Sequence, residues 1–136
     1  MGAWSHESFD NDDACDFSSD LLDTEDLSIV EDAFNIVINS TGAYLEAPDA
    51  ARAIAAAEVL ARLQGNWGVR NAYTETVDTW VAQVKVAPDE AIRQKALQAI
   101  DRTLEQPSEL LDLWQESGKQ ESWIAAVNDL KQRVQK

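Results

Sequence analysis

Cysteine and histidine are almost absent from this chain of 136 residues. Cys15 is the only cysteine, so no intramolecular disulfide can form, and a reducing compartment such as the cytoplasm is the simplest setting. His6 is the only histidine and has no second ligand at metal-binding spacing, which argues against a transition-metal site. We expect neither a metal nor a cofactor.

Long apolar runs are also missing. No stretch approaches the roughly 18 uninterrupted apolar residues of a membrane span, and no charged segment followed by an apolar run opens the chain. We therefore expect a protein that is neither exported nor inserted into a membrane.

Lys and Arg are absent from the first 51 positions, which hold thirteen acidic residues. From Arg52 onward the chain has 12 acidic and 11 basic residues, so the formal net charge of -14 belongs almost entirely to the N-terminal region. Such a field is repelled by nucleic-acid phosphate and by anionic lipid. We expect no direct nucleic-acid or membrane binding, and a basic protein as the partner.

The apolar residues predict a folded, all-α protein. They make up 45% of the chain and include five tryptophans, and they recur at helical spacing with Gly and Pro between the runs. We expect one compact domain, residues 1–136, with about seven helices. Their predicted ranges are 12–23, 24 or 26 to 41, 49–64, 72–86, 88–105, a short helix from 107, and a C-terminal helix after Gly118. The alanine-rich segment 49–64 is the best candidate for a central helix.

The N-terminal region carries a compact motif that includes Gly2, Trp4, Phe9, Asn11, Asp12, Ala14 and Asp16. Later segments add Ala-Ala-Ala-Glu-Val at 55–59, Ser-Glu-Leu-Leu-Asp-Leu-Trp at 108–114, and Trp123 with Leu130. Together these residues resemble a bacterial family of small proteins, the domain-of-unknown-function family 4259. The resemblance implies an all-helical fold and no established activity. Some small bacterial families of this kind are encoded beside toxins as immunity proteins, which is an analogy.

Three residues of this motif have a structural interpretation. Trp4 and Phe9 lie just before the first predicted helix, where an apolar residue commonly packs back on that helix. Asn11 is a suitable N-cap for the same helix. We therefore expect residues 1–10 to form an arm that docks on the bundle.

Four aspartates are spaced to share one face of the first helix: Asp12, Asp16, Asp20 and Asp23. Like charges at this spacing destabilise an isolated helix, and no base precedes Arg52 to offset them. Two interpretations stay open. Solvent, salt and later bases, among them Arg52, Arg62, Arg70 and Arg93, can compensate the charges, or a basic partner can do so. Glu31 and Asp32, with Glu25 and Asp26, extend the field along the second helix.

The first functional hypothesis is an acidic, non-enzymatic binding module of the immunity type, which masks a basic surface of a toxin or nucleic-acid-acting enzyme. The alternative is a carboxylate-based enzyme that uses a divalent cation, with Asp10, Asp12, Asp13 or Asp16 as the candidate groups. An EF-hand is excluded, because Cys15 stands where the loop requires glycine and Leu21 where it requires glutamate. A third hypothesis is a scaffold subunit whose exposed tryptophans build an oligomer. The oligomeric state stays open.

Overall fold

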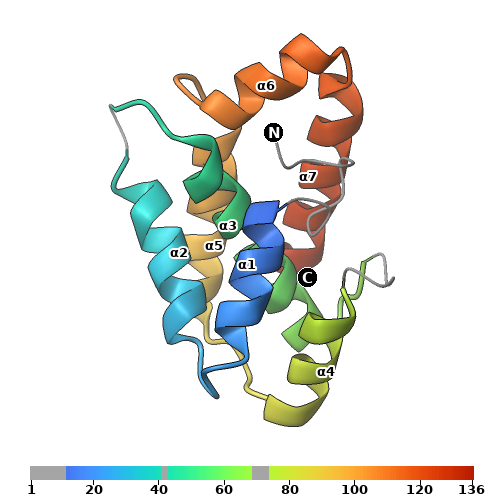
Figure 1. Cartoon of the computed structure of the whole chain (residues 1–136). Helices are drawn as coiled ribbons and strands as arrows, with labels where there is room; N and C mark the ends of the chain where they lie inside the picture. The colour runs from blue at the N-terminus through green and yellow to red at the C-terminus, as the bar shows by residue number, and fades with distance from the viewer. Residues whose placement is uncertain (1–11, 41–42, 69–73) are drawn as a thin grey trace.

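The computed structural model describes residues 12–40, 43–68 and 74–136, in which the chain forms seven α-helices. They are α1 (Asp12–Leu21), α2 (Ser28–Ile38), α3 (Ala47–Leu63), α4 (Glu75–Val84), α5 (Glu90–Thr103), α6 (Glu109–Ser117) and α7 (Gln120–Gln135). They pack into a compact bundle (Figure 1), so the predicted all-α class is confirmed. The predicted arm, residues 1–10 with Trp4 and Phe9, and the predicted N-cap Asn11 lie outside the described residues.

Helix α3 is the centre of the bundle and contacts each of the other helices (Figure 1). From Ala50 to Arg62 every residue except Arg52 is buried. Most of these side chains are alanine methyl groups, and small side chains at a helix contact let the neighbouring axes come close. The prediction of a central, alanine-rich helix is confirmed.

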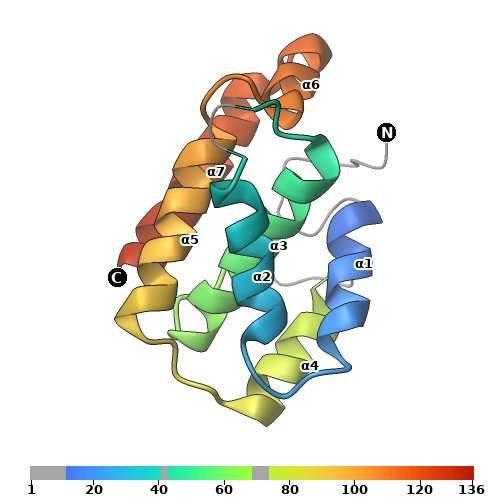
Figure 2. The same cartoon turned by 90° about the vertical axis from the view of Figure 1, so that its left-hand side faces the viewer.

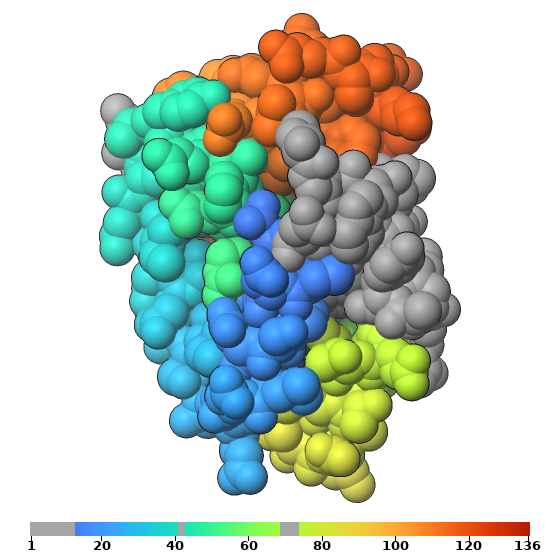
Figure 3. Space-filling view, viewed as in Figure 1, coloured from blue at the N-terminus to red at the C-terminus, as the bar shows by residue number. Residues whose placement is uncertain are grey.

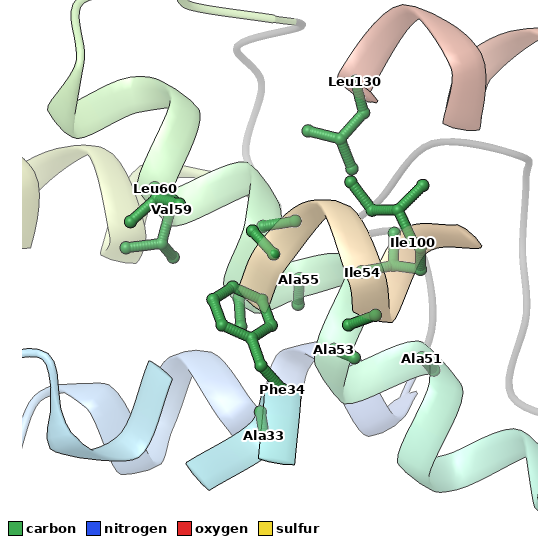
Figure 4. Packing of buried hydrophobic residues seen from close by; sticks show 14 of the residues in the cluster. Ala33, Phe34, Ala51, Ala53, Ile54, Ala55, Val59, Leu60, Ile100 and Leu130 are labelled. Atoms are coloured by element: carbon green, nitrogen blue, oxygen red, sulfur yellow. The ribbon is translucent and has the colours of Figure 1, made fainter. Parts of the chain in front are cut away.

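Larger side chains from the surrounding helices fill the space around α3. Phe34 of α2 is fully buried and points toward α3 (Figure 4). Ile100 of α5 and Leu130 of α7 are also buried and point toward one another in the same view. The view in Figure 2 shows α2 beside α5, with α1 and α4 on another side of α3. The apolar core therefore extends from α1 and α2 to α7.

Most helix ends follow their sequence signals. Pro48 lies in the first turn of α3, and Gly118, with a φ of +78°, ends α6. Asp89 caps α5 by accepting a hydrogen bond from the backbone N–H of Ile92 at 2.9 Å. The signals available in the sequence therefore place these boundaries within a few residues.

The second helix is shorter than predicted. It begins at Ser28 and ends at Ile38, whereas the prediction ran from Thr24 or Asp26 to 41. The start is displaced because Asp26 does not enter the helix: its carboxylate accepts hydrogen bonds from both the backbone N–H and the hydroxyl of Ser28. The side chain thus fixes a turn immediately before α2.

Candidate functional site

Helix α1 directs its carboxylates to solvent because its apolar side chains face the core. Ala14, Phe17 and Leu21 are fully buried, while Asp16 and Asp20 are exposed. The backbone of Asp12 begins the helix, but its side chain lies outside the described part of the chain. The predicted outward row of aspartates is therefore present in α1 at two described positions.

Asp23 does not continue this row within the helix. Helix α1 ends at Leu21, two residues earlier than predicted, and Asp23 lies in the following turn with its backbone N–H donating to the carbonyl of Asp20 at 3.1 Å. The side chain of Asp23 is still exposed.

We name seven of the exposed or half-buried carboxylates of α1, α2 and the connection between them the acidic surface: Asp16, Asp20, Asp23, Glu25, Asp26, Glu31 and Asp32. Atoms of α1 and α2 cover the front and left of the molecule in Figure 3, with part of α3 visible between them. Helices α1 and α2 both pack on α3. The two helices that carry most of the acidic surface therefore pack on the same helix, α3.

Two bases from later helices partly compensate this surface. Arg52 of α3 pairs with Asp20, with its Nη2 2.9 Å from Oδ2, and its guanidinium also lies over the ring of Phe17. Lys95 of α5 pairs with Glu31 at 3.1 Å. Within the described residues, five carboxylates of the acidic surface form no ion pair with Lys or Arg, namely Asp16, Asp23, Glu25, Asp26 and Asp32.

Two further bases predicted to compensate the aspartates form their described ion pairs elsewhere. Arg93 pairs with Glu90 on its own helix at 3.1 Å, and Arg62 points into the protein. Arg70 lies outside the described residues. Among the described bases, only Arg52 and Lys95 therefore form ion pairs with carboxylates of the acidic surface.

The connection between α1 and α2 is held by Asp26. Its Oδ1 accepts hydrogen bonds from the backbone N–H of Ser28 at 3.0 Å and from the hydroxyls of Ser28 and Thr24 at 2.7 and 2.9 Å. The hydrogen bonds from Ser28 are the main cause of a lowered pKa of Asp26, because they stabilise the carboxylate form. The connection is therefore a defined turn that carries a permanent negative charge at neutral pH.

Two exposed aliphatic side chains accompany the carboxylates. Leu22, next to Asp23, is 58% exposed, and Ile36, one helical turn after Asp32, is 52% exposed. Carboxylates beside such side chains offer a partner both charge complementarity and apolar area.

Only some of the carboxylates named in the enzyme hypothesis lie in the described part of the chain. Asp10 and the side chain of Asp12 lie outside the described residues, Asp13 is half-buried and Asp16 is exposed. Among the described residues no group of three or more His, Cys, Asp or Glu side chains is placed to hold a metal ion. Cys15, the only cysteine of the chain, is half-buried.

Three of the tryptophans considered for an oligomer interface belong to the core. Trp80, Trp114 and Trp123 are buried, and the last two stack with their ring centroids 6.2 Å apart. Trp67 is 37% exposed, and Trp4 lies outside the described residues.

A second group of charges lies inside the bundle where α3, α4 and α7 meet. Glu58 and Arg62 of α3 are 3% and 2% exposed and are hydrogen-bonded to each other. Arg133 of α7 binds both oxygens of Glu58, at 2.7 and 2.9 Å, and Arg62 also donates to Asp78 of α4 at 2.8 Å. We name Glu58, Arg62, Asp78 and Arg133 the buried ion network. It contains two positive and two negative groups.

The network also orients the end of α7. Arg133 donates to Asp129 at 2.9 Å, and the side-chain amide of Asn66 donates to the backbone carbonyl of Arg133 at 2.8 Å. Burial by itself lowers the pKa of Arg133, but the hydrogen bonds and charges of Glu58 and Asp129 outweigh it, so this pKa is raised. The segment after α3 thus satisfies a carbonyl in the last turn of α7, a group that a helix cannot satisfy internally.

The buried ion network was not predicted from the sequence. Its signal was an acidic and a basic residue four positions apart, Glu58 and Arg62, inside a segment that is otherwise almost entirely apolar. Both oxygens of Glu58 are occupied by guanidinium N–H groups, which gives this carboxylate a structural role in joining α3 to α7.

Gly68 lies against the network. A Cβ atom at this position would be 2.6 Å from Oε1 of Glu58 and 2.7 Å from Nη1 of Arg133, and both atoms are held by hydrogen bonds. We expect Gly68→Ala to lower the free energy of unfolding by about 1 to 3 kcal/mol, measured by urea denaturation. The same substitution in a Glu58→Ala background is expected to cost much less, because the crowded carboxylate is then gone. Equal costs in both backgrounds would contradict this explanation.

Comparison with known proteins gives one match. The family model described as Domain of unknown function (DUF4259) matches residues 2–126. No curated protein and no solved structure matches the chain. Within the described residues, no helix combines the length and the apolar character required to cross a membrane.

Proposed function

We propose that this chain, which belongs to the DUF4259 family, is a non-enzymatic acidic binding module that masks a basic surface of a toxin or nucleic-acid-acting enzyme. The observation that carries the proposal is the acidic surface, where seven carboxylates meet two described bases. Five of these carboxylates form no ion pair with a described base, and a cationic partner is the chemistry that complements them. The single cysteine supports the reducing cytoplasm as the compartment.

In the proposed mechanism the carboxylates take the place of substrate phosphates in a cationic groove of the partner. The acidic surface raises the association rate by long-range attraction, which depends on ionic strength. Leu22 and Ile36 then contribute apolar contact area that salt does not screen. Complex formation is thus expected to be faster at low salt, with part of the affinity retained at high salt.

The test is capture followed by an activity assay. The chain is immobilised and exposed to native lysate at low and at high salt, and each captured basic protein is identified and purified. Its activity on nucleic acid or another substrate is then titrated with the chain. We expect full inhibition at a stoichiometric ratio. Capture of no basic protein, or of one whose activity is unaffected by the chain, would refute the function.

Neutralising three unpaired carboxylates gives a sharper prediction. We expect the triple variant Asp16→Asn, Asp23→Asn and Asp32→Asn to weaken binding of the captured partner by roughly tenfold to a thousandfold at low salt, measured by calorimetry. None of these aspartates forms an ion pair with a described base, so the changes leave no described arginine or lysine without its partner.

The matched control changes net charge by the same amount elsewhere. Glu105, Glu116 and Glu121 are exposed and lie outside the acidic surface, so their triple change to Gln is expected to alter binding only slightly. If both triple variants weaken binding equally, overall charge and not the acidic surface determines the affinity.

A further inference from the structure

Two side chains on one turn of α4 make buried polar contacts. One contact belongs to the buried ion network, and the other reaches the connection between α1 and α2. Asp78 accepts hydrogen bonds from Nε of Arg62 and from the hydroxyl of Thr74, each at 2.8 Å and on different oxygens. Two residues later, Trp80 is 3% exposed, and its indole N–H donates to the backbone carbonyl of Thr24 at 2.8 Å. One short helix therefore joins the network to the connection between α1 and α2.

The connection that Trp80 reaches is the non-helical part of the acidic surface. Thr24 lies between Asp23 and Glu25, and the local hydrogen bonds of this segment stay within residues 19–31. Among the described residues, the indole of Trp80 donates the only hydrogen bond to residues 22–27 that comes from outside residues 19–31. One hydrogen bond therefore ties the segment that carries these carboxylates to α4.

The attachment of α4 itself rests on few apolar groups. The helix spans Glu75–Val84, packs mainly on α1 and α3, and lies at one end of the bundle below α1 (Figure 2). Its buried apolar side chains are Val77, Trp80 and Val81. A helix held by so little apolar area depends strongly on buried polar contacts for its position, because an unsatisfied buried charge is costly.

We propose that α4 is a strut through which the buried ion network positions the carboxylates of Asp23, Glu25 and Asp26. Asp78 is then a positioning residue. When its ion pair with Arg62 is lost, α4 moves relative to α3, the hydrogen bond from Trp80 to Thr24 weakens, and the connection opens locally. The use of these carboxylates rests on the proposed function, whereas the coupling is a property of the fold.

Hydrogen exchange measured by NMR tests the coupling without any partner. The backbone N–H groups of Asp23, Thr24 and Ser28 are hydrogen-bonded, so their exchange reports local opening. We expect Asp78→Asn to accelerate exchange at these three amides by roughly tenfold. Slow amides in α5 are expected to change much less, because that helix packs mainly on α2, α3 and α7.

Three variants separate the strut from a general loss of stability. Trp80→Phe removes the indole N–H, so Asp78→Asn in this background is expected to add little further acceleration at Asp23, Thr24 and Ser28. Asp129→Asn removes a different carboxylate from Arg133, outside α4, and is expected to leave these amides unchanged. If Asp78→Asn does not fold, Thr74→Val removes one hydrogen bond to Asp78 and takes its place in the cycle.

The exchange rates of these variants either support or overturn the proposal. Local acceleration that disappears in the Trp80→Phe background supports the strut. Three results would overturn the strut. Exchange could accelerate uniformly across α5 and the connection, the effects of Asp78→Asn and Trp80→Phe could be additive, or exchange could show no acceleration.

Binding of an octalysine peptide, measured by calorimetry, separates this inference from the proposed function. We expect Asp78→Asn to weaken octalysine binding by roughly threefold to tenfold, although residue 78 is not part of the acidic surface. Accelerated exchange with unchanged octalysine binding would retain the strut and count against a binding role for the connection. Weakened binding with unchanged exchange would overturn the strut and leave the proposed function intact.

Discussion

Glu58→Gln is expected to lower the free energy of unfolding by about 3 to 5 kcal/mol, because it leaves two guanidinium groups without their shared carboxylate. Arg62 is almost completely buried, and Arg133 is largely buried, so water cannot easily replace the lost charge. Glutamine keeps the shape of the side chain, and the loss therefore reports charge and hydrogen bonding more than volume. The measurement is urea denaturation followed by circular dichroism.

An exposed pair of similar geometry is the control. Lys131 and Asp101 are 2.7 Å apart, but their side chains are 32% and 57% exposed. Asp101→Asn is expected to change the free energy of unfolding by no more than about 1 kcal/mol, since exposed ion pairs contribute little. If Glu58→Gln costs no more than Asp101→Asn, the buried ion network does not hold α3, α4 and α7 together.

The helices could be predicted because their signals are local. The alanines of α3, Pro48 in its first turn and Gly118 after α6 act within a few residues of where they stand. The burial of α3 could be predicted because its sequence segment has almost no polar face. The exact start of α2 could not be predicted in the same way, because either Asp26 or Thr24 could have capped the helix, and Asp26 instead binds Ser28 ahead of it.

The buried ion network could not be predicted because its partners are distant in the sequence. Glu58 and Arg62 are one helical turn apart, a spacing typical of a surface pair. Their burial depends on Arg133, 75 residues after Glu58, and on α4, whose position is decided by packing. The acidic surface was easier to predict, since exposure of Asp16 and Asp20 follows from the inward face of α1. The pairing of Asp20 with Arg52 required the packing of α1 on α3.

Phe34→Ala is expected to lower the free energy of unfolding by about 3 to 5 kcal/mol, measured by urea denaturation. Phe34 is fully buried where α2 meets α3 and α5 (Figure 4), and the surrounding alanine methyl groups are too short to fill the space of a missing ring. The residual cavity adds to the lost transfer free energy of the aromatic ring. The effect should therefore lie at the upper end of the range for core truncations.

Ile36 on the same helix gives the matched control for both stability and function. Its side chain is 52% exposed, so Ile36→Ala is expected to change the free energy of unfolding by less than about 0.5 kcal/mol. The two substitutions also separate the roles of the two faces of α2. Phe34→Ala is expected to loosen the packing of α2 and so to make the positions of Glu31 and Asp32 less fixed. Ile36→Ala is expected to leave these carboxylates in place and to remove only apolar contact area from the proposed interface. A cost for Ile36→Ala as large as that for Phe34→Ala would show that the exposed face of α2 is part of the stabilising core and not a surface available to a partner.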